Sequence, residues 1–132
     1  MNDYIKTKKT VSLINYHFVF CPRYRRKIFS IPEVKEYFQY LSRISCEKIG
    51  VDIITMECGE DYVYMFLNCP PTISPSDIIN KIKSATSKAI REEFKELSKM
   101  PSLWTRNYFV STESNVCSEI IKKYIQDQKT RS

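Results

Sequence analysis

The sequence is poor in histidine, in glycine and in paired cysteines. Its 132 residues include one histidine (His17), two glycines and five cysteines, and no two cysteines form a Cys-x-x-Cys motif. A structural zinc site needs about four closely spaced nitrogen or sulfur ligands, so none is expected. The odd number of cysteines, with no secretory leader, predicts reduced thiols in a cytoplasmic protein.

Long apolar segments are also missing. No apolar run approaches the roughly 20 residues that a membrane-spanning helix requires, so no membrane partner is expected. Internal repeats and low-complexity segments are absent too. A chain of 132 residues with 42% hydrophobic residues can bury one core, which predicts a single domain over residues 1–132.

Positive charge is in excess. The chain has 21 Lys and Arg residues against 15 Asp and Glu residues, for a formal net charge of +6. This excess favours a polyanionic partner such as a nucleic acid. An ordinary basic protein without such a partner has the same composition, so charge alone leaves both interpretations open.

Apolar periodicity and turn residues predict an alternation of strands and helices. Strands are expected at 11–21, 51–57, 61–68 and about 104–112, and helices at 32–49, 74–97 and about 115–128. Ser74 followed by Pro75 is a typical helix start, and Gly50 is a plausible residue just after a helix end. The order predicts an α+β, ferredoxin-like (RRM-like) βαββαβ sandwich with an added C-terminal helix.

The expected strand at 61–68 carries three aromatic residues on one face. Because side chains alternate along a strand, Tyr62, Tyr64 and Phe66 point to one side, and the apolar residues between them point to the core. The aromatic row can stack on bases, form the floor of an active site, or pack beneath the final helix. The residues themselves leave these interpretations open.

The expected C-terminal helix combines a tyrosine with a glutamine. Tyr124 and Gln128 are four residues apart and therefore share one helical face. A tyrosine that is activated by a base or a metal can attack phosphorus and form a covalent phosphotyrosine. An ordinary packed tyrosine is the alternative interpretation.

Several segments resemble, in the same order, the small single-tyrosine transposases of the insertion-sequence 200/605 family. The resemblance covers roughly residues 10–130. The matching segments are 16–27, 61–67 with Pro70-Pro71 after it, 81–87, 103–104 leading to 108–112, and 124–128.

The resemblance implies a function and a set of site residues. Enzymes of this family are dimers that bind single-stranded DNA hairpins at element ends, and their tyrosine forms a 5′-phosphotyrosine. Two strand histidines and a glutamine hold Mg²⁺ or Mn²⁺. The resemblance implies that Tyr124 is the nucleophile and Gln128 a metal ligand, with DNA bound by a basic loop and the second long helix: Arg23, Tyr24, Arg25, Arg26, Lys27, Lys81 and Lys83.

The chain departs from the family at its His-hydrophobic-His (HUH) motif. The corresponding residues here are Tyr62-Val63-Tyr64, so both histidines are replaced by tyrosines. A neutral phenol is a poor ligand for a hard divalent cation compared with imidazole or carboxylate. We therefore expect Mg²⁺ or Mn²⁺ to bind weakly or not at all. The family's glycine before the tyrosine helix is also absent, because the segment here reads Glu113-Ser114-Asn115.

Three functional hypotheses follow. The first is a single-stranded DNA hairpin-binding protein of the transposase type whose metal-dependent cleavage is lost or weakened. The second is an active single-tyrosine transposase whose metal site is reorganised around Glu57, Glu60 or Asp61. The third is an RNA-binding module that uses Tyr62 and Tyr64 as a stacking platform, but it leaves the pairing of Tyr124 with Gln128 unexplained.

Overall fold

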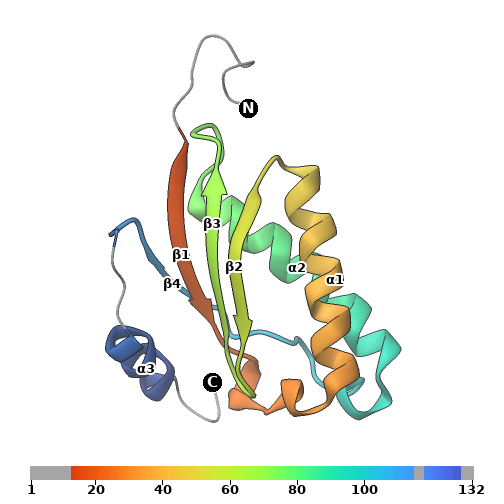
Figure 1. Ribbon diagram of the computed structural model, residues 1–132. Helices are drawn as coiled ribbons and strands as arrows, with labels where there is room; N and C mark the ends of the chain where they lie inside the picture. Colours follow the sequence, from red (N-terminus) through yellow and green to blue (C-terminus); the bar gives the residue numbers. More distant parts are fainter. Residues whose placement is uncertain (1–12, 115–117, 129–132) are drawn as a thin grey trace.

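The structure is a computed structural model that describes residues 13–114 and 118–128. Four strands and three helices follow one another along the chain (Figure 1). They are β1 (Ile14–Phe20), α1 (Pro32–Lys48), β2 (Asp52–Cys58), β3 (Val63–Cys69), α2 (Pro75–Glu93), β4 (Phe109–Ser111) and α3 (Ser118–Asp127). Short 3-10 turns occupy Arg23–Arg25, Ile28–Ser30 and Lys95–Leu97.

The strands form one antiparallel sheet in the order β2-β3-β1-β4. Helices α1 and α2 cover one face of this sheet, whereas α3 lies on the opposite side (Figure 1). The arrangement confirms the predicted α+β ferredoxin-like sandwich with an added C-terminal helix. Within the described residues, no helix is both long and apolar enough to span a membrane.

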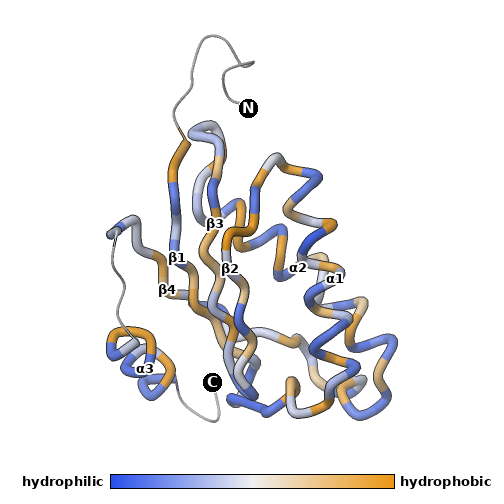
Figure 2. The backbone as a smooth tube through the Cα atoms, viewed as in Figure 1, coloured by the Kyte–Doolittle hydropathy of each residue, from blue (hydrophilic) through white to orange (hydrophobic). Residues whose placement is uncertain are grey.

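The main core lies between the sheet and the two long helices. Alternate residues of β1 and β3 are fully buried there, including Phe18, Phe20, Met65 and Leu67. The core joins apolar residues of the sheet to apolar residues of α1 and α2, and Figure 2 shows apolar positions in orange along the strands and both helices. Burying such side chains supplies the main favourable free energy of folding, at about 25 cal/mol for each Å² of apolar surface.

The predicted helix boundary residues behave as expected. The side chain of Ser74 accepts a hydrogen bond of 3.1 Å from the backbone amide of Asp77, and Pro75 is the first residue of α2. Gly50 follows α1 with φ of +74°, a left-handed conformation that favours glycine. Local sequence thus sets the start of α2 and the end of α1.

The predicted strand at 104–112 is wrong over most of its length, because β4 spans only Phe109–Ser111. Residue Trp104 forms an isolated bridge with Pro22, and its indole Nε1 donates a 2.9 Å hydrogen bond to Thr86 Oγ1. Its ring packs edge-on against Phe20. Anchoring this ring in the core prevents the segment before β4 from running along the sheet.

The predicted helix at 74–97 is too long by four residues. Its helical part ends at Glu93, and Phe94 is extended before a separate 3-10 turn. The ends of two other elements also differ from the prediction: β3 begins at Val63 rather than at residue 61, and α3 begins at Ser118. Residues 11–12 and 115–117, which were included in predicted elements, lie outside the described residues.

Candidate tyrosine site and nucleic-acid interface

The second face of the sheet carries a small apolar cluster beneath α3. Val19 of β1, Cys21 just after that strand and Ile125 of α3 are buried together there. The partly buried residues packed against them are Tyr62, Tyr64, Phe109, Ile121 and Tyr124. The fold therefore brings the tyrosines at 62, 64 and 124 to one place, although they come from the β2–β3 hairpin and from the C-terminal helix.

Tyr124 is held by a neutral partner. Its hydroxyl donates a 2.8 Å hydrogen bond to the side-chain oxygen of Asn107, which lies just before β4. Burial, and secondarily the neighbouring Cys21 thiol, raises the pKa of Tyr124 well above its usual range. An amide oxygen is not a base, so this environment keeps the phenol protonated instead of activating it.

Gln128 follows the end of α3 and is buried. Its side-chain nitrogen donates a 3.3 Å hydrogen bond to the backbone carbonyl of Tyr124. The predicted proximity of the two residues is thus present, but it is a contact between the glutamine side chain and the tyrosine main chain. This bond leaves the side-chain oxygen of Gln128 as the atom that could face a ligand.

Tyr64 is paired with a residue whose orientation the sequence analysis left undetermined. The hydroxyl of Tyr64 lies 2.8 Å from Nδ1 of His17. The His17 imidazole is only 5% exposed and stacks on Phe66, with ring centroids 4.3 Å apart. Strand alternation alone could have placed His17 on this face, because it shares the parity of Val19.

Burial, with a smaller contribution from the Glu57 carboxylate, raises the pKa of Tyr64. Glu57 is the direct cross-strand partner of Tyr64 in the β2–β3 pair. A negative charge beside a phenol opposes its ionisation, so Tyr64 remains a neutral group.

The residues at this place do not fit a site for Mg²⁺ or Mn²⁺. These cations prefer several oxygen ligands that carry negative charge, and the raised pKa of Tyr64 keeps its phenol neutral. No group of three or more His, Cys, Asp or Glu side chains that could hold a metal occurs within 13–114 and 118–128. Asp61, one of the carboxylates considered for a reorganised site, forms a 3.2 Å ion pair with Arg25 instead.

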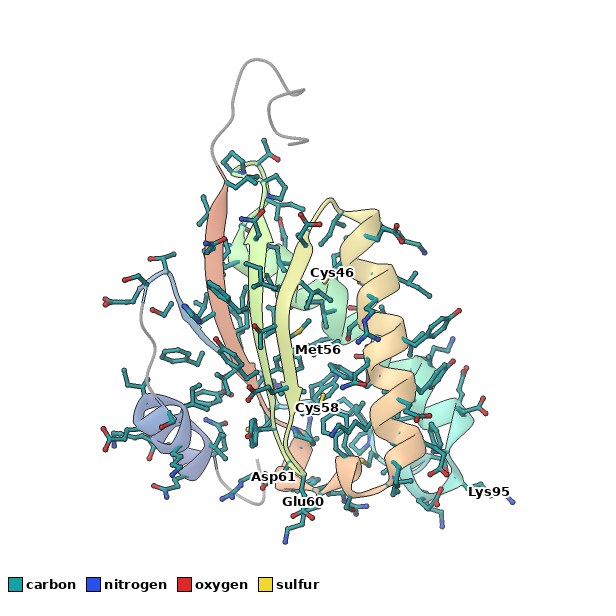
Figure 3. The ribbon with its side chains drawn as sticks, in the orientation of Figure 1. Cys46, Met56, Cys58, Glu60, Asp61 and Lys95 are labelled. Atoms are coloured by element: carbon teal, nitrogen blue, oxygen red, sulfur yellow. The ribbon has the colours of Figure 1, made fainter. Side chains whose placement is uncertain are left out.

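The turn that joins β2 and β3 presents Glu60 and Asp61 together at one end of the sheet (Figure 3). The amide of Gly59 donates a 3.0 Å hydrogen bond to the carbonyl of Tyr62 and closes this turn. A Cβ atom at Gly59 would clash with the Tyr62 ring, so only glycine leaves room for this ring to pack against the backbone. Tyr62 is consequently a turn residue, whereas Tyr64 lies within the strand.

The basic loop divides into two pairs of cations. The side chains of Arg23 and Arg25 are half-buried and bind Ser102 and Asp61, at 2.9 and 3.2 Å respectively. In contrast, Arg26 and Lys27 are exposed, as is Tyr24 between the two arginines. Only the second pair is free to approach a phosphate without breaking a contact seen in the structure.

The two lysines predicted on α2 also differ from each other. Lys81 is exposed, whereas Lys83 turns inward and donates hydrogen bonds of 2.9 Å to the backbone carbonyls of Thr105 and Asn107. Burial lowers the pKa of Lys83 to about 8. Lys83 therefore holds the segment that presents Asn107 to Tyr124, a role that the sequence analysis missed.

A family model described as "Transposase IS200 like" matches residues 10–128. The chain belongs to this family of transposases. The transposase for insertion sequence element IS200 of Salmonella typhimurium is 33% identical over 116 residues, which cover 86% of this chain and 75% of that protein.

Two solved structures resemble this IS200-like transposase. A Deinococcus radiodurans protein described as a transposase superposes with a TM-score of 0.84 at 24% identity, over 92% of this chain and 95% of its own. A REP-associated tyrosine transposase, solved bound to a REP hairpin, superposes with a TM-score of 0.58 at 11% identity, over 86% of this chain and 61% of its own. At these identities the likeness supports the fold.

Proposed function

We propose that this IS200-like transposase binds single-stranded DNA hairpins as a homodimer and that its metal-dependent cleavage is lost or much weakened. The observation that carries the proposal is the environment of Tyr64. It occupies a position where the family resemblance implies a metal-binding histidine, and its hydroxyl is instead hydrogen-bonded to His17 at 2.8 Å.

Several features support the binding half of the proposal. The net charge of +6 and the exposed cations Arg26, Lys27 and Lys81 suit a phosphate backbone. Family membership points to DNA as the partner. A structural neighbour was solved with a hairpin bound, which makes a hairpin the first ligand to test.

The chemistry of the site supports the second half. A divalent ion that polarises a phosphoryl oxygen contributes several kcal/mol, and each 1.36 kcal/mol is about tenfold in rate. Replacing both histidines of the HUH motif by Tyr62 and Tyr64 removes the ligands that such an ion needs. Among the described residues, the Tyr124 hydroxyl is hydrogen-bonded to the Asn107 amide, which is not a base.

The alternative function is an active single-tyrosine transposase with a reorganised metal site. One observation favours it: Glu57 is exposed and lies directly opposite Tyr64 in the sheet. A cation held by Glu57 together with Gln128 would be needed to place a phosphate near Tyr124. The ion pair of Asp61 with Arg25 counts against this arrangement, because it occupies another carboxylate that such a site could use.

A covalent-adduct assay tests the proposal. The full chain is incubated with a single-stranded hairpin that has unpaired flanks, in Mg²⁺ or Mn²⁺, and adducts are sought by denaturing gel and mass spectrometry. We expect tight binding, measured by fluorescence anisotropy, with stronger affinity for the hairpin than for a duplex of the same sequence. We expect no adduct, or one formed orders of magnitude more slowly than binding. Rapid adduct formation that is absent from Tyr124→Phe would overturn the loss of cleavage.

A further inference from the structure

A hydrogen-bond donor and an acceptor lie side by side where the HUH motif would hold a metal. Glu57 and Tyr64 are directly opposite each other on neighbouring strands, a placement that brings Cβ atoms to about 4.5–5.5 Å. The Glu57 side chain is exposed and Tyr64 is half-buried. A carboxylate can only accept hydrogen bonds, whereas a phenol can also donate one.

His17 decides where the phenolic proton of Tyr64 points. Within the described part of the chain, Nε2 of His17 is buried and has no hydrogen-bond partner. An orphaned buried N–H is rarer and more costly than an orphaned acceptor, so the neutral imidazole carries its proton on Nδ1. His17 Nδ1 then donates to the Tyr64 oxygen, and the phenolic proton has to point away from His17. His17 is thus a positioning residue for Tyr64.

We propose that Glu57 and Tyr64 bind the Watson–Crick edge of an unpaired nucleobase in single-stranded DNA. This inference rests on the DNA binding proposed above and names the part of the DNA that the altered motif contacts. Each base presents a donor next to an acceptor on that edge, and proteins that bind single strands read it once the base is unpaired. The carboxylate of Glu57 accepts from the base, and the hydroxyl of Tyr64 donates to it.

The charge of the site favours a base over a phosphate. Glu57 repels a phosphate anion, and no cation pairs with it among the ion pairs of the described residues. Nucleobases are neutral and their amino groups are attracted to a carboxylate. Aromatic surface is available for stacking as well, because Phe66 is half-buried on the same face, and such stacking stabilises bound bases by about 1–3 kcal/mol each.

A double-mutant cycle between protein and DNA tests the contact. The probe is a fluorescein-labelled DNA hairpin whose unpaired flanks carry one abasic site at each position in turn. We expect Tyr64→Phe to weaken hairpin binding about three- to tenfold. In that variant, an abasic site at the contacted position should weaken binding little further. Tyr62→Phe is the matched control and should retain the full abasic effect.

The outcomes separate this inference from the proposed function. If the wild-type chain does not bind the hairpin, DNA binding itself fails. If it binds and no flank position couples to Tyr64→Phe, only the nucleobase site is overturned. If Tyr64→Phe couples to a methylphosphonate substitution and not to an abasic site, Tyr64 contacts a phosphate. This result would also overturn the nucleobase site.

Replacing Glu57 by glutamine changes hairpin affinity in opposite directions for a nucleobase contact and for a phosphate contact. Glu57→Gln and the control Glu60→Gln remove the same charge, and Glu60 is an exposed residue of the adjoining turn. For a nucleobase site, Glu57→Gln binds the hairpin more weakly than Glu60→Gln does. For a phosphate it binds more tightly, because repulsion has been removed, and this result would overturn the inference.

The His17 tautomer gives an independent measurement that needs no DNA. Nitrogen-15 NMR of the free protein should show a proton on Nδ1 and none on Nε2 at neutral pH. A proton on Nε2 would mean that Tyr64 donates to His17, so its hydroxyl would not be available to a base.

Discussion

The side-chain nitrogen of Lys83 and the backbone carbonyl oxygen of Asn107 lie 2.9 Å apart, and this contact joins α2 to the tyrosine site. The side-chain oxygen of the same asparagine accepts a hydrogen bond from the Tyr124 hydroxyl. A chain of hydrogen bonds therefore connects a helix on one face of the sheet to a helix on the other. Both helices depend on the irregular segment before β4 for this connection.

Removing the Asn107 side chain should loosen α3. In Asn107→Ala, Tyr124 loses its hydrogen-bond partner, and an exposed bond of this kind stabilises by about 0.5–1 kcal/mol. We expect amide hydrogen exchange in Ser118–Asp127 to accelerate about two- to fivefold. Asn80→Ala, a change at an exposed position of α2, is the control and should leave α3 unchanged. Equal exchange rates in the two variants would contradict a role for Asn107 in holding α3.

Lys83 should make the free energy of unfolding rise with pH in the alkaline range. Its pKa is lowered from 10.5 to about 8 in the folded protein, so the unfolded chain holds this proton more tightly. Between about pH 8 and 10.5 the unfolded state binds more protons, and the contribution of Lys83 to the free energy of unfolding rises with pH. Below about pH 8 both states are protonated and that contribution is constant.

Urea unfolding at several pH values measures this effect. The free energy of unfolding of the wild type minus that of Lys83→Met should increase from pH 8 to pH 10. A buried thiol such as Cys46, whose pKa is raised to about 12 by burial and not by Lys83, titrates alike in both proteins and cancels in the difference. Lys95→Met, at an exposed residue, should show no such trend. A flat difference for Lys83→Met would indicate an ordinary lysine pKa.

Restoring histidine at the HUH positions should restore metal affinity. In the double variant Tyr62→His, Tyr64→His, two imidazoles replace phenols in the cluster beneath α3. We expect Mn²⁺ binding, detected by electron paramagnetic resonance, where the wild type shows much weaker binding. Hairpin cleavage through Tyr124 should appear with it. Tyr40→His, at a tyrosine that is 58% exposed on α1, is the control. Absence of Mn²⁺ binding in the double variant would show that more than two ligands have been lost.

The exposed pair of the basic loop should account for its phosphate contacts. Arg26→Ala and Lys27→Ala each should lower affinity for single-stranded DNA and reduce the salt slope by about 0.7 per lost contact. Lys95→Ala is the control, because Lys95 projects from the outer end of the helical layer, away from α3 (Figure 3). A salt slope that stays constant in both loop variants would place the phosphate contacts elsewhere.

Arg25→Ala should act mainly on stability, because Arg25 is paired within the protein. The change leaves the partly buried carboxylate of Asp61 without its cation. We expect a lower thermal midpoint than for Arg26→Ala, with a smaller change in salt slope, measured by thermal unfolding and by anisotropy titration. The reverse order would mean that Arg25 releases Asp61 to bind DNA.

Local sequence was sufficient for the features that depend on neighbours along the chain. The Ser74 cap, the glycine after α1 and the alternation of Val63, Tyr64 and Met65 all follow from backbone geometry within a few residues. The βαββαβ order and the family resemblance follow in the same way from segments read one at a time. The ends of β4 and α2 did not, because Trp104 and Phe94 are placed by the core rather than by their neighbours.

The sequence by itself determined that this chain has the fold of an IS200-like transposase and that residues 62 and 64 are tyrosines. Only the tertiary structure decided which polar side chains are still free. Lys83 and Arg25 look like their exposed neighbours in the sequence, yet each finds a partner distant along the chain, at Asn107 and Asp61. Most buried polar groups are hydrogen-bonded, and the partner is set by how strands and helices pack, which no local pattern encodes.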